Sequence, residues 1–159
     1  MKKIIYIFAL IALLYSVNNC GYTPIFGSNN SNIKINDYYL DGNESINQKI
    51  YSSIKSLLLR NDKNSKEVNL YIKSTKNKLV TSTSISGEAR EYKIVLSTEI
   101  KLKDPLSNDI LFEYSNELTQ SFKVQDQIFA TENVENKTTN NLTDRMSQDL
   151  LTKISQIKI

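Results

Sequence analysis

Histidine and tryptophan are absent from this chain of 159 residues, and cysteine occurs once. Without an imidazole the chain has neither a Ser-His-Asp or Cys-His nucleophile nor an HExxH metal site. A single cysteine permits neither an intramolecular disulfide nor a cysteine-built zinc site. The 4 glycines stand singly, so there is no glycine-rich phosphate loop. These absences predict a protein that is not an enzyme and that needs no metal and no cofactor.

The basic residues of the chain are scattered, except for a pair of lysines at its start. The formal net charge is +3, and Lys2 and Lys3 precede an apolar run over residues 4 to 17. A basic start followed by an apolar run shorter than the ~20 residues of a spanning helix is typical of a secretory signal peptide. We therefore expect residues 1–19 to be a signal peptide. Its removal leaves 18 basic residues against 17 acidic ones, and no basic block that would favour a nucleic acid partner.

The only cysteine, Cys20, directly follows this predicted signal. In bacteria this is the position at which a lipoprotein signal is cut and the cysteine is acylated, with palmitate as a typical acyl chain. Asn19 stands where such signals usually carry a small residue, and an ordinary core cysteine is the alternative. Residues 20–32 are rich in Gly, Asn and Ser and are expected to form a lipidated, flexible tether. A single domain is then expected over residues 33–159.

Hydrophobic periodicity predicts the elements of this domain. A short strand with Ile33, Ile35 and Tyr39 on one face precedes a helix from about Ser45, for which Ser45 and Gln48 have the spacing of a capping box. The helix carries one apolar stripe: Ile46, Ile50, Ile54, Leu57 and Leu58. A second helix is expected at the C-terminal end, after a polar stretch over residues 131 to 141, with its stripe on Leu142, Met146, Leu150, Leu151, Ile154 and Ile157.

Three strands are predicted between the two helices. Residues 68 to 85 alternate, but the pattern shifts phase near Lys76 to Lys78, which indicates either one long strand with a bulge or two short strands. Residues 92 to 102 and 110 to 122 alternate more regularly, and the first of these segments should bury one face, with Tyr92, Ile94, Leu96, Ile100 and Leu102. The predicted fold is therefore α+β: a two-layer sandwich of an about four-stranded, mostly antiparallel sheet with two helices on one face, in the order strand-helix-strand-strand-strand-helix.

Few residues offer themselves as a binding site. Arg90 follows the predicted Ser86-Gly87 turn, and Lys78 and Lys93 lie close in sequence to the same hairpin end. Three cations gathered there would bind a phosphorylated glycolipid, and an ordinary solvated loop is the alternative. Tyr71 is out of phase with the apolar residues of its strand, so its ring should lie on the polar face. It either lies flat on the sheet or contacts a partner protein or an acyl chain.

Three short motifs resemble the lipopolysaccharide-assembly lipoprotein family LptE, particularly its alphaproteobacterial members. They are CGYTPIFG from Cys20, SGEAREY from Ser86 and TDRMSQD from Thr143. The resemblance implies a lipoprotein that is lipid-anchored at Cys20 on the periplasmic side of the outer membrane. It also implies that the protein plugs and helps to assemble an LptD-type β-barrel partner, which delivers lipopolysaccharide to the surface of a Gram-negative cell.

Direct lipopolysaccharide binding does not transfer residue by residue. The basic residues that some family members use for this role fall near Ile85 and Thr131, and neither is basic. Lys78, Arg90 and Lys93 are neighbours in the same region. The alternative function is that of a membrane-tethered periplasmic ligand-binding or inhibitor module.

Overall fold

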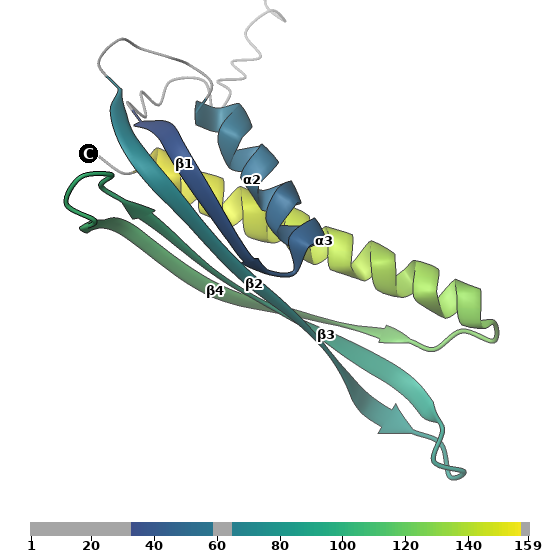
Figure 1. Cartoon of the computed structure of the whole chain (residues 1–159). Helices are drawn as coiled ribbons and strands as arrows, with labels where there is room; N and C mark the ends of the chain where they lie inside the picture. The colour runs from purple at the N-terminus through teal and green to yellow at the C-terminus, as the bar shows by residue number, and fades with distance from the viewer. Residues whose placement is uncertain (1–32, 59–64, 157–159) are drawn as a thin grey trace, which may run out of the picture.

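The computed structural model describes residues 33–58 and 65–156, and Figure 1 shows their arrangement. The elements follow the predicted order: β1 (Ile33–Gly42), α2 (Glu44–Leu58), β2 (Lys66–Thr83), β3 (Ala89–Lys103), β4 (Ile110–Lys123) and α3 (Ile128–Ser155). The predicted signal peptide, Cys20 and the predicted tether over residues 20–32 lie outside the described residues, as does Ile157.

The four strands form one open, mixed sheet in the order β1-β2-β3-β4. β1 and β2 are parallel because α2 crosses over between them, whereas β2, β3 and β4 form an antiparallel meander. Both helices lie on the same face of this sheet (Figure 1), where α2 contacts β1 and β2, and α3 contacts β3 and β4. The prediction of an α+β, two-layer architecture is confirmed.

The core fills the space between the sheet and the helices. The predicted stripes of both helices point into it, and so do the alternate residues of β2 and β3. Its largest fully enclosed members are aliphatic side chains and one methionine: Ile50, Ile54, Leu70, Ile72, Ile94, Leu96, Ile100, Leu102, Leu142, Met146, Leu150 and Ile154. The phase predicted for the strand over residues 92 to 102 is thus confirmed.

β1 departs from the predicted phase. Its register with β2 shifts between Ile35 and Asp37, so one extra residue enters the strand. Because a one-residue insertion moves every later side chain to the opposite face, Tyr39 does not share a face with Ile33. It lies 48% exposed on the side of the sheet that the helices do not cover, and the prediction for Tyr39 is wrong.

The start of α2 also differs from the prediction. Asn43 is the residue that caps the helix, since its Oδ1 accepts a hydrogen bond from the backbone N–H of Ile46 at 3.1 Å. Ser45 lies inside the first turn, so the predicted Ser45–Gln48 capping box is wrong. The backbone N–H of Asn43 in turn donates to the carbonyl oxygen of Ser74 at 2.9 Å, which fixes the helix start against β2.

β2 is one continuous strand of 18 residues, the first of the two predicted forms. Its register shifts fall between Val80 and Thr83 and not at Lys76 to Lys78. The phase change seen in the sequence has another cause: Lys76 and Lys78 stand on the helix-facing side, at positions where the earlier part of the strand carries apolar residues.

Candidate functional site

The candidate site is the far end of the β2–β3 hairpin together with the first turns of α3. In Figure 1 the hairpin projects beyond α2 and past the rest of the sheet. The inner face of β2 is covered by α2 only as far as Ser74, because α2 begins at Glu44, directly after the Asn43–Ser74 contact. Beyond this point Lys76 and Lys78 of β2 contact α3, although Lys76 still lines a groove with Ser45, Ile46 and Lys49 of α2.

Glu135 of α3 joins the two lysines of β2 to the helix. Its Oε1 accepts from Lys76 Nζ and its Oε2 from Lys78 Nζ, each at 2.7 Å, and its side chain is 17% exposed. Partial burial disfavours the ionised carboxylate, but the hydrogen bonds and charges of the two lysines outweigh it and hold the pKa of Glu135 below its usual value. The polar first half of α3 is therefore held to the sheet by a two-lysine, one-carboxylate cluster.

An aromatic pair lies beside this cluster. The ammonium of Lys78 sits 4.2 Å from the centroid of the Tyr92 ring, which tilts against Phe122 of β4 with centroids 5.7 Å apart. The Glu135 carboxylate and the Tyr92 ring both contact the ammonium of Lys78, so this predicted site residue already makes contacts within the protein. It still has 35% of its side-chain surface exposed, so its ammonium remains reachable from outside.

The three predicted site residues are not brought to one face. Lys78 pairs across the ladder with Ile94, which points into the core, so the neighbouring Lys93 points to the uncovered face of the sheet. Arg90 is exposed at the hairpin end, in an open groove that it lines with Lys123, Asp126 and other residues of β3 and β4. The structure places all three near one end of the molecule, with Lys93 on the face opposite to Lys78.

Exposed apolar side chains gather at the same end. Ile85 at the hairpin tip is fully exposed, and Ile128 and Phe129 at the start of α3 are each 78% exposed. Leu79 and Val80 on β2 are about half exposed, on opposite faces of the strand. Exposed apolar groups and the cationic Arg90 at the same end of the molecule suit an amphiphile with an anionic head, or an apolar protein wall.

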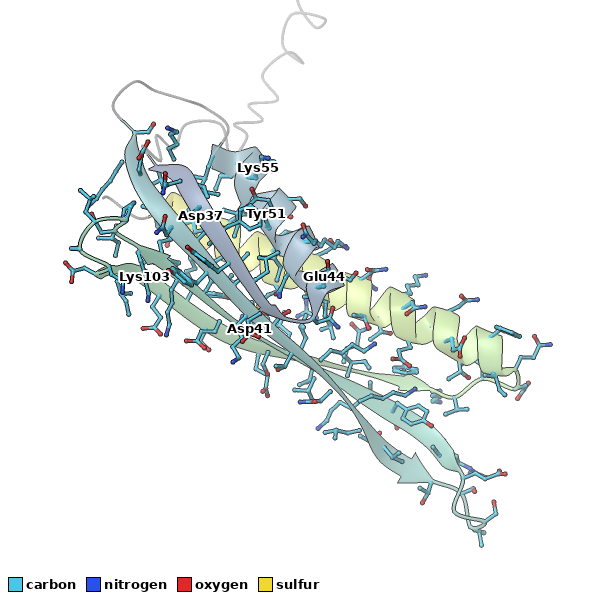
Figure 2. The ribbon with its side chains drawn as sticks, in the orientation of Figure 1. Asp37, Asp41, Glu44, Tyr51, Lys55 and Lys103 are labelled. Atoms are coloured by element: carbon cyan, nitrogen blue, oxygen red, sulfur yellow. The ribbon has the colours of Figure 1, made fainter. Side chains whose placement is uncertain are left out.

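Another candidate surface lies on the uncovered face of the sheet. The rings of Tyr39 and Tyr71 stack with centroids 4.7 Å apart, and the ammonium of Lys103 lies 4.7 Å from the Tyr71 centroid. Tyr71 thus lies on the polar face, as predicted. Tyr39, Tyr71 and Lys103 line an open groove together with Asp41. Figure 2 labels Asp41 and Lys103. A hydrogen bond from Lys73, and its charge, lower the pKa of Asp41.

Sequence reasoning missed Glu135 and Lys76. The sequence did contain one signal: Lys76 and Lys78 stand at positions of the strand that alternate with its outward residues. Two cations on the side that faces the helices require a carboxylate from a helix. Over residues 33–58 and 65–156 there is no group of three or more His, Cys, Asp or Glu side chains placed to hold a metal ion. Within those ranges no helix has the length and apolar character needed to cross a membrane.

Solved structures share this β-α-β-β-β-α fold. Rare lipoprotein B from Shewanella oneidensis superposes with a TM-score of 0.56 at 13% identity, covering 76% of this chain and 94% of that one. Lipoprotein B from Nitrosomonas europaea gives a TM-score of 0.56 at 19% identity, over 79% and 86% of the two chains. A minor lipoprotein from Acinetobacter baumannii gives 0.56 at 11%, over 75% and 90%. The fold is that of these bacterial lipoproteins.

The family follows from the sequence itself. The model of the LptE lipopolysaccharide-assembly family matches residues 32–154, which include every described strand and nearly all of both helices. The chain belongs to the LptE family. Comparison with the curated protein sequences finds no match.

Proposed function

We propose that this protein is a non-enzymatic lipoprotein of the outer membrane that plugs an LptD-type β-barrel from the periplasmic side and helps the barrel to assemble for lipopolysaccharide transport. The observation that carries the proposal is the family match over residues 32–154. The projecting hairpin supports it, because its exposed apolar end is a surface that a partner would cover.

The test is affinity purification of the tagged full-length chain from outer membranes dissolved in mild detergent. Mass spectrometry should identify a large β-barrel protein in stoichiometric amount. Depletion of the chain should also lower the amount of folded barrel, seen as a loss of heat-modifiable migration in gels. Recovery of the chain without any barrel partner contradicts the proposal.

Two finer features belong to the same proposal. Cys20 carries the lipid anchor, since it directly follows a signal-like segment and an acylated cysteine holds a protein stably at a membrane. Lipopolysaccharide contacts the hairpin end, where Arg90 and Lys78 supply cations and exposed apolar side chains such as Ile85 lie at the same end, while Lys93 supplies a cation on the face opposite to Lys78. Arg90→Ala should weaken binding of purified lipopolysaccharide, whereas Lys34→Ala, at the far end of β1, should not.

The second candidate function is a membrane-tethered periplasmic ligand-binding or inhibitor module. The groove beside Tyr39, Tyr71 and Lys103 favours it, since stacked rings and a cation form a surface for planar or sugar-like ligands. Tyr71→Ala separates the two functions. It should leave barrel recovery unchanged if the protein is a plug, and abolish ligand capture if the groove is the working site.

A further inference from the structure

β4 forms one edge of the sheet. It pairs with β3 along its whole length, from Ile110 to Lys123, and no other described strand pairs with its second side. The ladder identifies which backbone groups face outward. Val124 donates its N–H to the carbonyl oxygen of Arg90, so the even-numbered residues of β4 are those bonded to β3. The N–H and C=O groups of residues 113, 115, 117, 119 and 121 therefore face the open edge.

A side-chain contact agrees with this assignment. The N–H of Glu117 donates to Oδ1 of the neighbouring Asn116 at 2.8 Å, which an N–H engaged in the β3 ladder would not do. The other outward residues, Ser115, Thr119 and Ser121 among them, use no side chain of the described residues in this way.

Apart from two glutamates and the Glu117 N–H bonded to Asn116, the edge carries few of the features that normally block strand addition. β4 contains no proline, its register with β3 shifts only next to Lys103, and its single lysine is the last residue, Lys123. The opposite edge differs, because β1 is shorter and carries a bulge between Ile35 and Asp37. Of the two edges, β4 is the one on which a further strand finds a straight, regular template.

The inner side of this edge is incompletely covered. Leu118 is only partly buried, and a groove opens between β4 and α3 beside Asn116, Arg145 and Asp149. Asp149 is engaged, since Tyr114 and Asn116 both donate to its Oδ2. Arg145 lies in the groove and forms no ion pair within the described residues. A side chain entering the groove would therefore meet a guanidinium that has no ion-pair partner among the described residues, with the Asp149 carboxylate in the same groove.

We propose that the β4 edge takes up an extended segment of the barrel partner as a fifth strand of this sheet, with a carboxylate of that segment bound by Arg145. The inference rests on the proposed function. The segment comes from a loop or a terminal stretch of the partner and not from its wall, because the strands of a closed barrel have already paired their backbone groups with one another. The exposed Arg145 fixes the chemistry of the segment: an acidic side chain on its helix-facing side.

The experiment places the photoreactive residue p-benzoylphenylalanine singly at Ser115, Thr119 or Ser121 of the full-length chain in cells, with Ser52 on the exposed side of α2 as the control position. After irradiation, adducts are purified and their sites are mapped by mass spectrometry. Strand pairing is one residue to one residue, so the three β4 positions should yield adducts to one segment of the barrel, displaced stepwise along it. Ser52 should yield none with that segment.

Two pairs of variants test the contacts. Thr119→Pro removes an outward donor without touching the β3 ladder and should lower adduct yield at Ser121 about tenfold, whereas Thr119→Ala should not. Arg145→Glu should lower the yield by a similar factor, and Arg145→Lys should retain most of it. Because Arg145 is exposed, this second pair remains informative if the proline variant fails to fold.

The outcomes separate the two proposals. Stepwise adducts to a barrel segment support the strand addition. Recovery of the barrel with adducts that are absent or unordered overturns it and leaves the plug function standing. Stepwise adducts to a second copy of this chain overturn the assignment of the partner. Failure to recover any barrel overturns both proposals.

Discussion

Substitution of Gly42 should destabilise the protein more than its surface position suggests. Gly42 ends β1 with φ +88°, a conformation in which a side chain is strained. A Cβ built on it would lie 2.0 Å from the carbonyl oxygen of Ser74. That oxygen accepts the hydrogen bond from Asn43 that fixes the start of α2, so the clash falls on the contact that positions the helix over the sheet.

The magnitude follows from two contributions. The positive φ alone costs an L-residue about 1–2 kcal/mol, of which the lower chain entropy of unfolded alanine returns about 0.4–1 kcal/mol. Relief of the clash requires β1 and β2 to separate near Ser74, which weakens the Asn43 hydrogen bond and loosens packing under α2, at about 2 kcal/mol. Gly42→Ala should thus lower the free energy of unfolding by about 3 kcal/mol.

Gly87 provides a matched control. Its φ is +87°, nearly that of Gly42, yet nothing lies within 4 Å of a Cβ built there. Gly87→Ala should therefore lose only the conformational contribution, about 1 kcal/mol or less. Urea unfolding followed by circular dichroism gives the free energy of unfolding of both variants. In thermal melts their melting temperatures should differ by about 8 °C. Equal destabilisation of the two would refute the claim that the approach to Ser74 matters.

Three further predictions concern the core, the ion cluster and the anchor. Leu96→Asp should unfold the domain, because it buries a charge at a fully enclosed position; a melt like that of the wild type contradicts the assigned phase. Glu135→Gln should cost about 1 kcal/mol at neutral pH. Because the pKa of Glu135 is lowered in the folded protein, its contribution to stability is present above pH ~4.3 and is lost as the pH falls through the folded pKa. The wild type and the Glu135→Gln variant should therefore become equally stable in acid. Urea unfolding at a series of pH values measures this. If acylation is the main anchor, Cys20→Ala should release the protein from membranes in fractionation; continued retention would point instead to the barrel partner or to an uncut signal.

The sequence predicted the fold because periodicity and burial are directly linked. Ile50, Ile54, Leu142 and Leu150 recur at helical spacing. A helix with one apolar stripe buries that stripe most readily by packing it against the apolar face of the sheet. What it could not predict was local backbone detail. A single extra residue after Ile35 moves the later side chains of β1 to the opposite face of the sheet, and no residue type at this position predicts the insertion.

The candidate site was predicted only in part, for a related reason. Lys78, Arg90 and Lys93 are close in sequence to the hairpin end, and the structure keeps them there. Which face each takes depends on the strand register, and the partner of Lys78 comes from a helix 57 residues away. A long-range ion pair leaves no periodic trace in the sequence, so the role of Glu135 emerges only from the packed structure.

The way the core ends supports the proposal that a partner covers the end of this hairpin. α2 covers β2 closely only to Ser74, and beyond it the inner positions carry Lys76 and Lys78, which share the single carboxylate of Glu135. Ion pairs that are largely sheltered hold two layers in register but contribute little net stability, since desolvation offsets most of the attraction. β4 pairs with β3 as far as Glu91, so the sheet is still three-stranded at Val80, and only the turn beyond lies outside it. Val80 and Ile85 are nevertheless exposed to solvent, and a second protein that enclosed this end would bury them.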